Sequence, residues 1–377
     1  MKHFLLLLTV LFILLGAGYS RADNVDVTAQ TGFEYTWWRD SESNTGYQIL
    51  VPVKISTQYQ AFAVSVLGGY AYSGYDSNTY SLNTLSQVTD TKVNLSYTLL
   101  DKLPFDVLFG LDFNIPTART SLSNQKLSLM MDPDLVPLSN LGEGFNINPT
   151  VSVAKNWGRL MTGLGLGYIW RGKYDYSTYF RDYEPGDIFT ATAEARYDFT
   201  SLWSGRLFGQ YARFGNDELR DRPIYREGDY YMTGLGLQYA PKPWNASLTF
   251  RYIYRGKSEL RSSSYSLSPT SNSLWGNEYT GDLMVSYLIS EPTTIWIKIS
   301  GLYVQENDYP DTYYCYIGKR LKASLELGWK RAFGQHWETN LFLRGFTLHD
   351  DNKIFPDYMG ERTYNGFSVG GAIIARY

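Results

Sequence analysis

The sequence contains little of what most enzymes and disulfide-stabilised proteins use. Its 377 residues hold one cysteine, Cys315, and three histidines, His3, His336 and His349. One cysteine excludes an intrachain disulfide, and so few histidines leave little for acid–base chemistry or metal binding. The formal net charge of −3 excludes the basic surface of a nucleic-acid-binding protein. We therefore expect no enzyme, no cofactor, no metal site and no nucleic-acid partner.

Long apolar runs are also missing, except at the start, which reads MKHFLLLLTVLFILLGAGYSRADNVD. A basic Lys2, a short apolar core and the small residues around Arg21 predict a secretory signal peptide over residues 1–22. The alternative is a retained anchor, but the apolar core is shorter than the ~20 residues that a spanning helix needs. The predicted mature chain, residues 23–377, has no later run of that kind.

Aromatic residues, in contrast, make up 16% of the chain, and many lie in segments of period two. In DIFTATAEARYDF, Phe189, Ala191 and Tyr197 lie on one face, whereas Thr192 and Glu194 lie on the other. Successive side chains of a strand point to opposite faces, so this pattern predicts a strand with one apolar and one polar face.

About sixteen such segments follow one another, and their connections alternate in length. Short ones read DKLP, NWGR, APKPW, SEPT and FGQH, and long ones cover residues 73–91, 173–187 and 256–277. This alternation is typical of an all-β, antiparallel, up-and-down transmembrane barrel with short periplasmic turns and long extracellular loops. A soluble β-sandwich is the alternative, but it does not need alternating connections. The pattern favours the outer membrane of a Gram-negative bacterium.

The last segment, NGFSVGGAIIARY, places Phe367 and Tyr377 on one face. A final strand that ends in an aromatic residue resembles the signal read by the outer-membrane assembly machinery. We expect this machinery, outer-membrane lipid and lipopolysaccharide as partners.

One hexapeptide occurs twice, as YIWRGK from Tyr168 and as YIYRGK from Tyr252. Each copy ends a predicted strand that leaves the membrane. The aromatic residues of the two copies are expected in the outer girdle, where rings are half in lipid and half in water; they are Tyr168, Trp170, Tyr252 and Tyr254. The basic residues are expected just above, over the mouth of the barrel; they are Arg171, Lys173, Arg255 and Lys257.

Charged residues also occupy the predicted inner wall. These are Arg251, Lys298, Lys322 and Arg344, with Glu194, Asp112, Glu34, Asp282 and Glu326 as acidic counterparts. Basic and acidic sides of a lumen would hold water and a transverse field, as in a pore. The alternative is a closed lumen in which the charges pair across neighbouring strands. Sixteen strands favour a channel, because barrels of that size leave an aqueous passage.

The segment 117–145 is unusually apolar for a loop. Its apolar side chains include Leu127, Leu129, Met130, Met131 and Leu135. Such a loop is expected to fold into the mouth, against the shallow wall left by Gly163, Gly165 and Gly167. There it would form a constriction or an apolar first site for solutes; a lid packed on its neighbours is the alternative.

Catalysis and metal binding have weaker signals. TLHDDNK places His349 beside Asp350, but adjacent residues of a strand face opposite ways. An outer-membrane hydrolase is therefore only the third candidate function, after a channel and a closed barrel. Loop carboxylates such as Asp308, Asp311 and Asp351 lack the ligand spacing of a known Ca²⁺ loop.

The stretches NIPTARTSLSNQ, GEGFNINPTVSV, GLGLGYIWRGKY and YEPGD resemble outer-membrane barrels associated with phenol meta-pathway degradation, distant relatives of hydrophobic-compound transporters. Ala118 departs from that pattern, in which Gly usually follows the Pro-Thr pair. The resemblance implies uptake of small organic or aromatic compounds. The sequence thus predicts a porin-like channel for passive uptake of small solutes. A closed barrel with adhesive or partner-sheathing loops is the main alternative, and the oligomeric state stays open.

Overall fold

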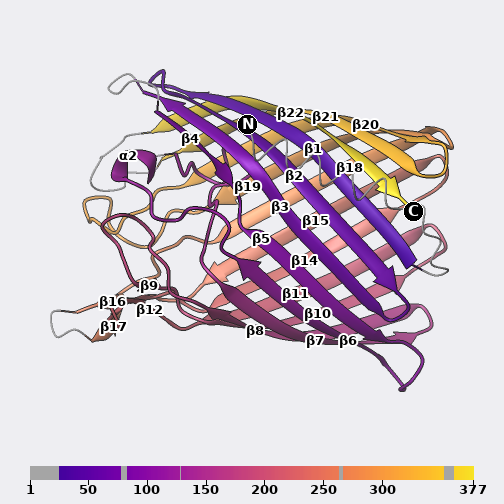
Figure 1. The fold of residues 1–377 in the computed structure, drawn as a ribbon, viewed down its shortest axis with the longest axis horizontal. Coiled ribbons are helices and arrows are strands. Elements are labelled where there is room, and N and C mark those ends of the chain that lie inside the picture. Colours follow the sequence, from indigo (N-terminus) through magenta and orange to yellow (C-terminus); the bar gives the residue numbers. More distant parts are fainter. Residues whose placement is uncertain (1–24, 78–82, 128, 263–265, 352–360) are drawn as a thin grey trace.

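The chain forms antiparallel strands that close into a barrel (Figure 1). The computed structural model describes residues 25–77, 83–127, 129–262, 266–351 and 361–377. The predicted signal peptide lies outside the described residues. Among those residues, none of the helices has the length and the apolar character needed to cross a bilayer.

The wall of the barrel consists of β1 (Val25–Asp40), β2 (Thr45–Tyr59), β3 (Phe62–Asp76), β4 (Asn83–Val88), β5 (Thr91–Leu99), β6 (Asp106–Ile115), β7 (Asn146–Trp157), β8 (Leu160–Arg171), β10 (Ile188–Asp198), β11 (Trp203–Phe214), β14 (Tyr230–Tyr239), β15 (Trp244–Arg255), β18 (Glu278–Ser290), β19 (Thr293–Val304), β20 (Arg320–Phe333), β21 (Trp337–Asp350) and β22 (Arg362–Arg376). Both β4 and β5 pair with β3, so they are two halves of one wall strand. The barrel therefore has sixteen strands, which confirms the predicted fold class.

Closure comes from the pairing of the first strand with the last. β1 and β22 pair antiparallel from Thr28↔Arg376 to Asp40↔Tyr364, and the backbone groups of Val27 and Tyr377 exchange hydrogen bonds of 2.8 and 2.9 Å. Among the described residues the wall sheet therefore closes on itself, so the backbone N–H and C=O groups of the wall find partners within the sheet.

The two ends of the barrel differ. At one end, called here the turn end, strands are joined by short connections such as 60–61, 158–159 and 291–292. At the other end, called here the loop end, the connections include 116–145. The alternation is not complete, because the first connection at the loop end, 41–44, is also short.

The three long loops predicted over 73–91, 173–187 and 256–277 all contain strands. The loop predicted over 73–91 is wrong in part, because β3 continues to Asp76 and β4 begins at Asn83. Five short strands at the loop end form a second sheet in the order β17-β16-β13-β12-β9. They are β9 (Tyr183–Glu184), β12 (Asn216–Leu219), β13 (Pro223–Arg226), β16 (Glu259–Arg261) and β17 (Leu267–Pro269). We call these strands the rim sheet.

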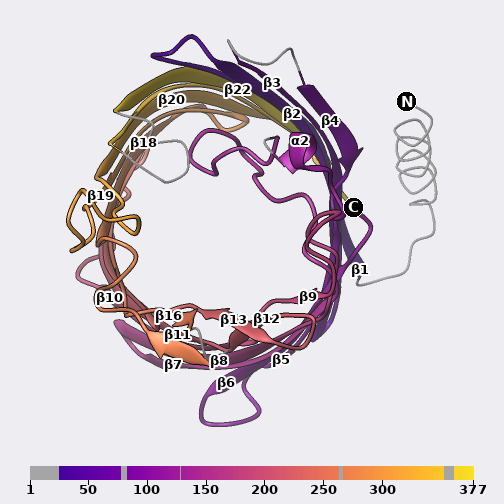
Figure 2. The same cartoon turned by 90° about the vertical axis from the view of Figure 1, so that its left-hand side faces the viewer.

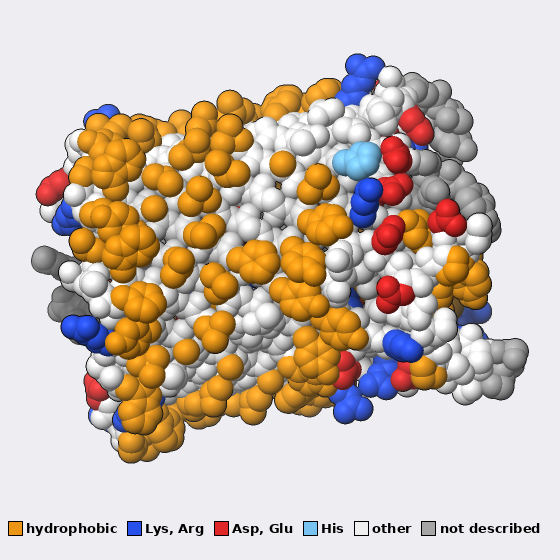
Figure 3. Space-filling model, turned by 180° about the vertical axis from the view of Figure 1, so that it is seen from behind, with side chains coloured by type: hydrophobic (Ala, Val, Ile, Leu, Met, Phe, Trp, Pro, Cys, Tyr) orange, Lys and Arg blue, Asp and Glu red, His pale blue; other side chains and the backbone are white. Residues whose placement is uncertain are grey.

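The period of two places apolar side chains on the outside. Leu164 and Leu166 of β8 are 62% and 52% exposed, and the small residues between them face inward. Figure 3 shows that hydrophobic side chains cover the outer face along most of its length, while charged side chains gather towards the two ends. Such an apolar band between polar ends is what a bilayer requires of a barrel.

The buried apolar clusters lie inside the loop end of the barrel. The segment 116–145, called here the inner loop, includes the short helix α2 (Asn124–Leu127) and lies within the ring of strands (Figure 2). One cluster packs Met131, Leu135 and Val136 of the inner loop on the wall residues Trp38 and Leu348. The interior of the barrel is thus apolar on one side of the loop end.

Candidate functional site in the barrel lumen

The inner wall carries ion pairs between neighbouring strands. On β15, β18 and β19, the Asp282 carboxylate lies 3.3 Å from Lys298 Nζ and 3.7 Å from an Arg251 guanidinium nitrogen. On β20 and β21, Arg344 lies 2.7 Å from the Glu326 carboxylate, and it also reaches Glu34 of β1 at 3.6 Å. These pairs lie midway along their strands.

Several of these side chains remain open to solvent. The side chains of Glu194 and Arg206, which form a pair at 3.8 Å, are 48% and 45% exposed. Lys298 is 39% exposed and Asp282 is 27% exposed. These residues face inward, away from the apolar outer belt. Their exposed surface therefore borders a space inside the barrel. Charged groups keep such exposure where water can reach them, because burying them dry is costly.

The predicted separation into a basic and an acidic side is wrong. Each of Arg251, Lys298 and Arg344 has its acidic partner on an adjacent strand, which is the pairing expected of the alternative reading. Asp112 is held by the amides of Asn94 and Asn148, the latter at 3.1 Å. The wall is therefore polar through local pairs, without opposed charged sides.

The basic residues predicted at the mouth also have partners at the loop end. Arg255 lies 3.4 Å from Glu278 and 3.9 Å from Glu227. Lys173 contacts Asp221 and lies 3.4 Å from Glu184. Arg171 ends β8, where its backbone N–H donates a 2.9 Å hydrogen bond to the Asp187 carboxylate. Lys257 follows β15 and lines a small polar hollow together with Tyr231, Tyr254 and Glu259.

The five apolar residues predicted to form the constriction all lie against the inner wall. Leu129 is 2% exposed and packs in a second cluster with Ala71 of β3 and Leu85 of β4. Leu127 and Met130 lie against that cluster, and Met131 and Leu135 belong to the first one. A buried leucine contributes about 1.5–3 kcal/mol, so the inner loop is firmly held.

The position of the inner loop differs from the expected one. We expected it against Gly163, Gly165 and Gly167 of β8, but both clusters lie on strands β1 to β4 and β21. Gly165 and Gly167 instead face hydroxyl side chains, such as Thr192, whose Oγ1 lies 2.7 Å from the position that a Gly165 Cβ would take, and the nearest atom to such a position at Gly163 is the Val153 carbonyl oxygen at 3.7 Å. These glycines make room for the polar inner wall, and not for the loop.

Polar contacts fix both ends of the inner loop. The Asp90 carboxylate, at the break between β4 and β5, accepts hydrogen bonds from the backbone N–H groups of Ala118 at 3.0 Å and Glu143 at 2.8 Å. It also accepts one from the Asn114 amide at 2.7 Å. Asp90 is 6% exposed, and a buried carboxylate requires such donors.

The middle of the inner loop is held by side chains of the wall. Gln48 of β2 donates to the Leu138 carbonyl at 2.9 Å and accepts from the Leu138 N–H at 3.1 Å. Arg320 of β20 reaches the carboxylates of Asp132 at 2.8 Å and Asp134 at 2.9 Å. Lys322, which we expected to line the lumen, donates to the Asp134 carbonyl at 2.5 Å.

The repeated hexapeptide occupies equivalent places in two hairpins. The N–H of Gly172 donates to the Phe145 carbonyl, and the N–H of Gly256 donates to the Asp229 carbonyl, both at 2.8 Å. Trp170 is 53% exposed and Tyr254 is 44% exposed on the outer face. Tyr168 contacts Trp170 with ring centroids 5.0 Å apart, and Tyr252 contacts Tyr279 at 5.2 Å. Each predicted girdle residue thus contacts another aromatic ring: Tyr168 and Trp170 contact each other, Tyr252 contacts Tyr279, and Tyr254 contacts Tyr231.

The C-terminal aromatic residues lie on the outer face as well. Phe367 is 39% exposed and contacts Trp37 with centroids 5.8 Å apart. Tyr377 is 41% exposed and stacks on His336 at 5.3 Å. The turn end therefore presents Tyr377 at the seam where the barrel closes.

The structure does not bring His349 and Asp350 together. His349 pairs with the outward-facing Leu321, and its Nδ1 lies 3.1 Å from Thr363 Oγ1. Asp350 faces inward and lies 2.5 Å from Arg320. The two side chains lie on opposite faces of β21, so they cannot act as a hydrolytic pair.

Acidic residues gather at one place in the rim sheet. Glu184, Glu218 and Asp221 can bring one oxygen each within 4.8 Å of the others. The Lys173 ammonium contacts two of the three, and its positive charge offsets part of their negative charge.

Two tyrosines near the rim sheet have raised pKa values. Burial raises the pKa of Tyr174 to about 12. Burial, together with a hydrogen bond to Asp217, also raises the pKa of Tyr183.

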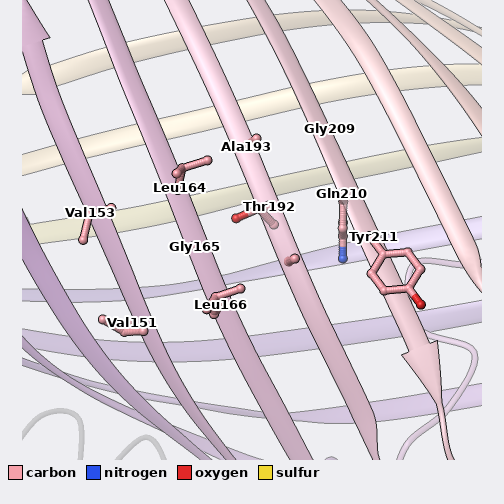
Figure 4. A pocket seen from close by; sticks show the side chains of 11 residues that line it. Val151, Val153, Leu164, Gly165, Leu166, Thr192, Ala193, Gly209, Gln210 and Tyr211 are labelled. Atoms are coloured by element: carbon pink, nitrogen blue, oxygen red, sulfur yellow. The ribbon is translucent and has the colours of Figure 1, made fainter.

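A hollow of about 580 Å³ lies on the outer face, and its lining is apolar. It forms where the small residues Ala191, Ala193 and Gly209 lie between Leu164, Leu166 and Tyr211 (Figure 4). Because these side chains face the bilayer, the hollow is a place for lipid chains and not for solutes in the lumen.

Sequence reasoning missed Asp90, Gln48 and Arg320, whose partners are distant in sequence. It also missed Lys54 and Lys92, which are exposed on the inner face of β2 and β5. The period of two in these strands contained enough information to place both lysines inward.

A closed antiparallel barrel with an apolar outer belt, aromatic rings on the outer face and a polar inner wall is an outer-membrane β-barrel, and the protein lies in the outer membrane of a Gram-negative bacterium. The chain belongs to the family described as "Putative MetA-pathway of phenol degradation", whose pattern matches residues 15–269. A comparison with curated proteins gives no match.

Three solved structures have a similar fold. OccK7 (OpdD) of Pseudomonas aeruginosa has a TM-score of 0.46 at 10% identity, covering 94% of this chain and 100% of that one. OprD of the same organism has a TM-score of 0.44 at 10% identity, covering 95% and 97%. An anion-selective porin from Comamonas acidovorans has a TM-score of 0.44 at 13% identity, covering 94% and 99%. At these values the likeness carries no argument about function.

Proposed function

We propose that the protein is a channel for the passive uptake of small solutes through the outer membrane. The observation that carries this proposal is the exposure of charged side chains midway along the inner wall, such as Lys298 at 39% and Arg344 at 36%. Sixteen strands enclose more space than side chains fill, so water and small solutes have room to pass. Passage then follows the concentration gradient.

The inner loop is the proposed constriction. It narrows the loop end on the side of β1 to β4, where Leu129, Met131 and Leu135 face the wall and the polar backbone of the loop is held by Asp90 and Gln48. Solutes pass between this loop and the wall strands that it does not contact, which carry Glu194, Arg206 and Arg251.

The family name supports small organic or aromatic compounds as solutes. The exposed rings at the loop end, including Tyr179 and Tyr314, offer first contacts to such molecules. Lipid and lipopolysaccharide surround the outer belt, and the assembly machinery is proposed to recognise the strand that ends in Tyr377.

Swelling of proteoliposomes tests this function. Vesicles that contain the purified protein should swell rapidly in a monosaccharide and slowly in a larger oligosaccharide. Deletion of residues 126–138 should raise the rate for the larger sugar, because it removes the constriction. Shortening of the connection 305–319, which contacts the connection 256–277 through Tyr309 and Asn272, should leave the size limit unchanged. Absence of swelling in every sugar would support a closed barrel instead.

A further inference from the structure

Two lysines face the lumen from neighbouring parts of the wall. In the strand register, Lys54 of β2 lies opposite Leu67 of β3, and Leu67 lies opposite Lys92 of β5. The two lysines therefore flank one residue of the strand between them. Two strand spacings separate their backbones by about 9.5 Å, and the flexible side chains can approach one solute from both sides. Both lysines are exposed.

These lysines differ from the ion-paired cations of the inner wall. Within the part of the chain that the structure describes, no carboxylate lies within 4.0 Å of either ammonium group, whereas Lys298 and Lys330 each have one at 3.3 and 3.1 Å. The neighbours in the register are neutral: Gln30 lies opposite Lys54, and Asn114 lies opposite Lys92.

The acidic side chains of the adjoining strands are committed elsewhere. Asp90 accepts three hydrogen bonds from the inner loop and Asn114, and Asp112 is held by Asn94 and Asn148. Glu34 of β1 is paired with Arg344. Neutral groups hold Asp90 and Asp112, which keep their negative charges, but within the described residues neither carboxylate lies within 4.0 Å of Lys54 or Lys92. The two ammonium groups are therefore free to contact an anion in the lumen.

An apolar surface lies between the two charges. Leu67 is 40% exposed on the inner face of the barrel. Its side chain faces the lumen and is therefore not part of the apolar belt that contacts lipid. Nearer the loop end, the same strands carry Leu50, Ala71 and Leu85, on which the inner loop packs. A solute that passes the apolar inner loop therefore meets Leu67 and two cations next.

We propose that Lys54, Leu67 and Lys92 form a binding position for organic anions with a carboxylate and an apolar body, such as aromatic carboxylates. The carboxylate contacts the ammonium groups, and the apolar body lies on Leu67. The proposal rests on the proposed channel function and names its solute class. A site with two unpaired cations in a water-filled lumen attracts anions and repels cations.

Planar bilayers with the purified full-length protein test this position, with benzoate as the probe and acetate as its counterpart without a ring. The wild-type channel should prefer chloride to potassium, and benzoate should block the chloride current at lower concentrations than acetate. The Lys54→Gln/Lys92→Gln variant should lose most of the anion preference and need about 100-fold more benzoate for half-block, since each of the two lost charge-assisted hydrogen bonds is worth roughly a factor of ten.

Two further variants separate the roles. Leu67→Ser should weaken the block by benzoate and leave the chloride preference unchanged. Lys54→Arg/Lys92→Arg should retain the preference, which shows that the effect depends on charge. Lys155→Gln/Arg331→Gln removes the same charge outside the lumen and should change neither quantity.

The outcomes distinguish this inference from the function on which it rests. A wild-type protein that forms no conducting pores would overturn the channel itself. A conducting channel whose chloride preference and benzoate block are unchanged in the Lys54→Gln/Lys92→Gln variant would overturn only the binding position. Equal block by benzoate and acetate would remove Leu67 from it.

Discussion

Arg320 holds the inner loop to the wall of the barrel with a single side chain. Its guanidinium lies 2.8 Å from Asp132, 2.9 Å from Asp134 and 2.5 Å from Asp350. Its side chain is only 19% exposed, so solvent screens these contacts weakly. Without the guanidinium, the three carboxylates would repel one another at these short separations.

We predict that Arg320→Gln loosens the inner loop and leaves the barrel closed. Loss of one partner from a buried charge network costs about 3 kcal/mol, which corresponds to roughly 100-fold faster local opening. Hydrogen exchange of the amides of residues 131–136, measured on the folded protein in detergent, checks this. Arg331→Gln, on the outer face of the same strand, is the control. Equal exchange in both variants would mean that Arg320 does not hold the loop.

Tyr174 gives the rim sheet a dependence on high pH. Burial raises its pKa to about 12 in the fold, above the ordinary value of about 10. The neutral phenol is therefore favoured by the fold. Its contribution to stability is fully present below pH ~10 and is lost as the pH rises towards about 12.

The Tyr174→Phe variant should remove this dependence. In the wild type, exchange at the backbone N–H of Tyr183, which donates to the Tyr174 carbonyl at 3.0 Å, should rise between pH ~10 and ~12 relative to the intrinsic rate. In the variant the extra rise should vanish. Identical curves for the two proteins would assign the dependence to another group.

Glycines allow the wall strands to approach one another at the loop end. A Cβ on Gly228 would lie 2.1 Å from the Gly256 carbonyl oxygen, and a Cβ on Gly276 would lie 1.7 Å from the Gln305 oxygen. Each glycine comes just before a wall strand begins, beside the end of a neighbouring strand. Close backbone approach, and not turn geometry, requires glycine at these places.

Gly228→Ala should destabilise the barrel by about 2 kcal/mol or more, because neighbouring backbone must move. Gly281→Ala on β18 is the matched control, since a Cβ there would meet nothing within 4 Å. Thermal unfolding in detergent, followed by circular dichroism, should show a lower midpoint for Gly228→Ala alone. A midpoint equal to that of the control would show that the strand ends adapt at no cost.

The strands could be predicted because the information for each is local. The alternation in DIFTATAEARYDF placed Ala191 and Ala193 outward and Glu194 inward, as the register of β10 with β8 and β11 shows. The break between β4 and β5 was not predictable in this way. At the break, both the backbone N–H of Asp90, which donates to the Leu141 carbonyl, and its carboxylate bind the inner loop.

The position of the inner loop and the pattern of ion pairs could not be predicted from the sequence. Gln48 is 90 residues from Leu138, and Arg320 is 186 residues from Asp134, so nothing in the local sequence connects them. The apolar composition of the loop indicated that its side chains are buried away from water. The choice of wall depends on shape and on distant polar partners, which appear only once the barrel closes.

The complete barrel has an apolar outer face and a polar inner face that is open to solvent. Exposed apolar side chains lie on the outer face from β1 (Phe33, 50%) to β22 (Ile373, 50%), and the inner face keeps charged side chains such as Lys298 and Asp282 in contact with solvent. The inner loop occupies one side of the loop end and is held by contacts to β2, β4 and β20. The proposed pore, narrowed on one side, rests on these three features together.

The conductance of the purified protein in a planar lipid bilayer tests this account most directly. We predict discrete current steps at rest whose size grows with salt concentration, because ions cross a water-filled lumen. We also predict larger steps after deletion of residues 126–138. A protein that inserts as a folded barrel and carries no current, with or without the deletion, would contradict the account.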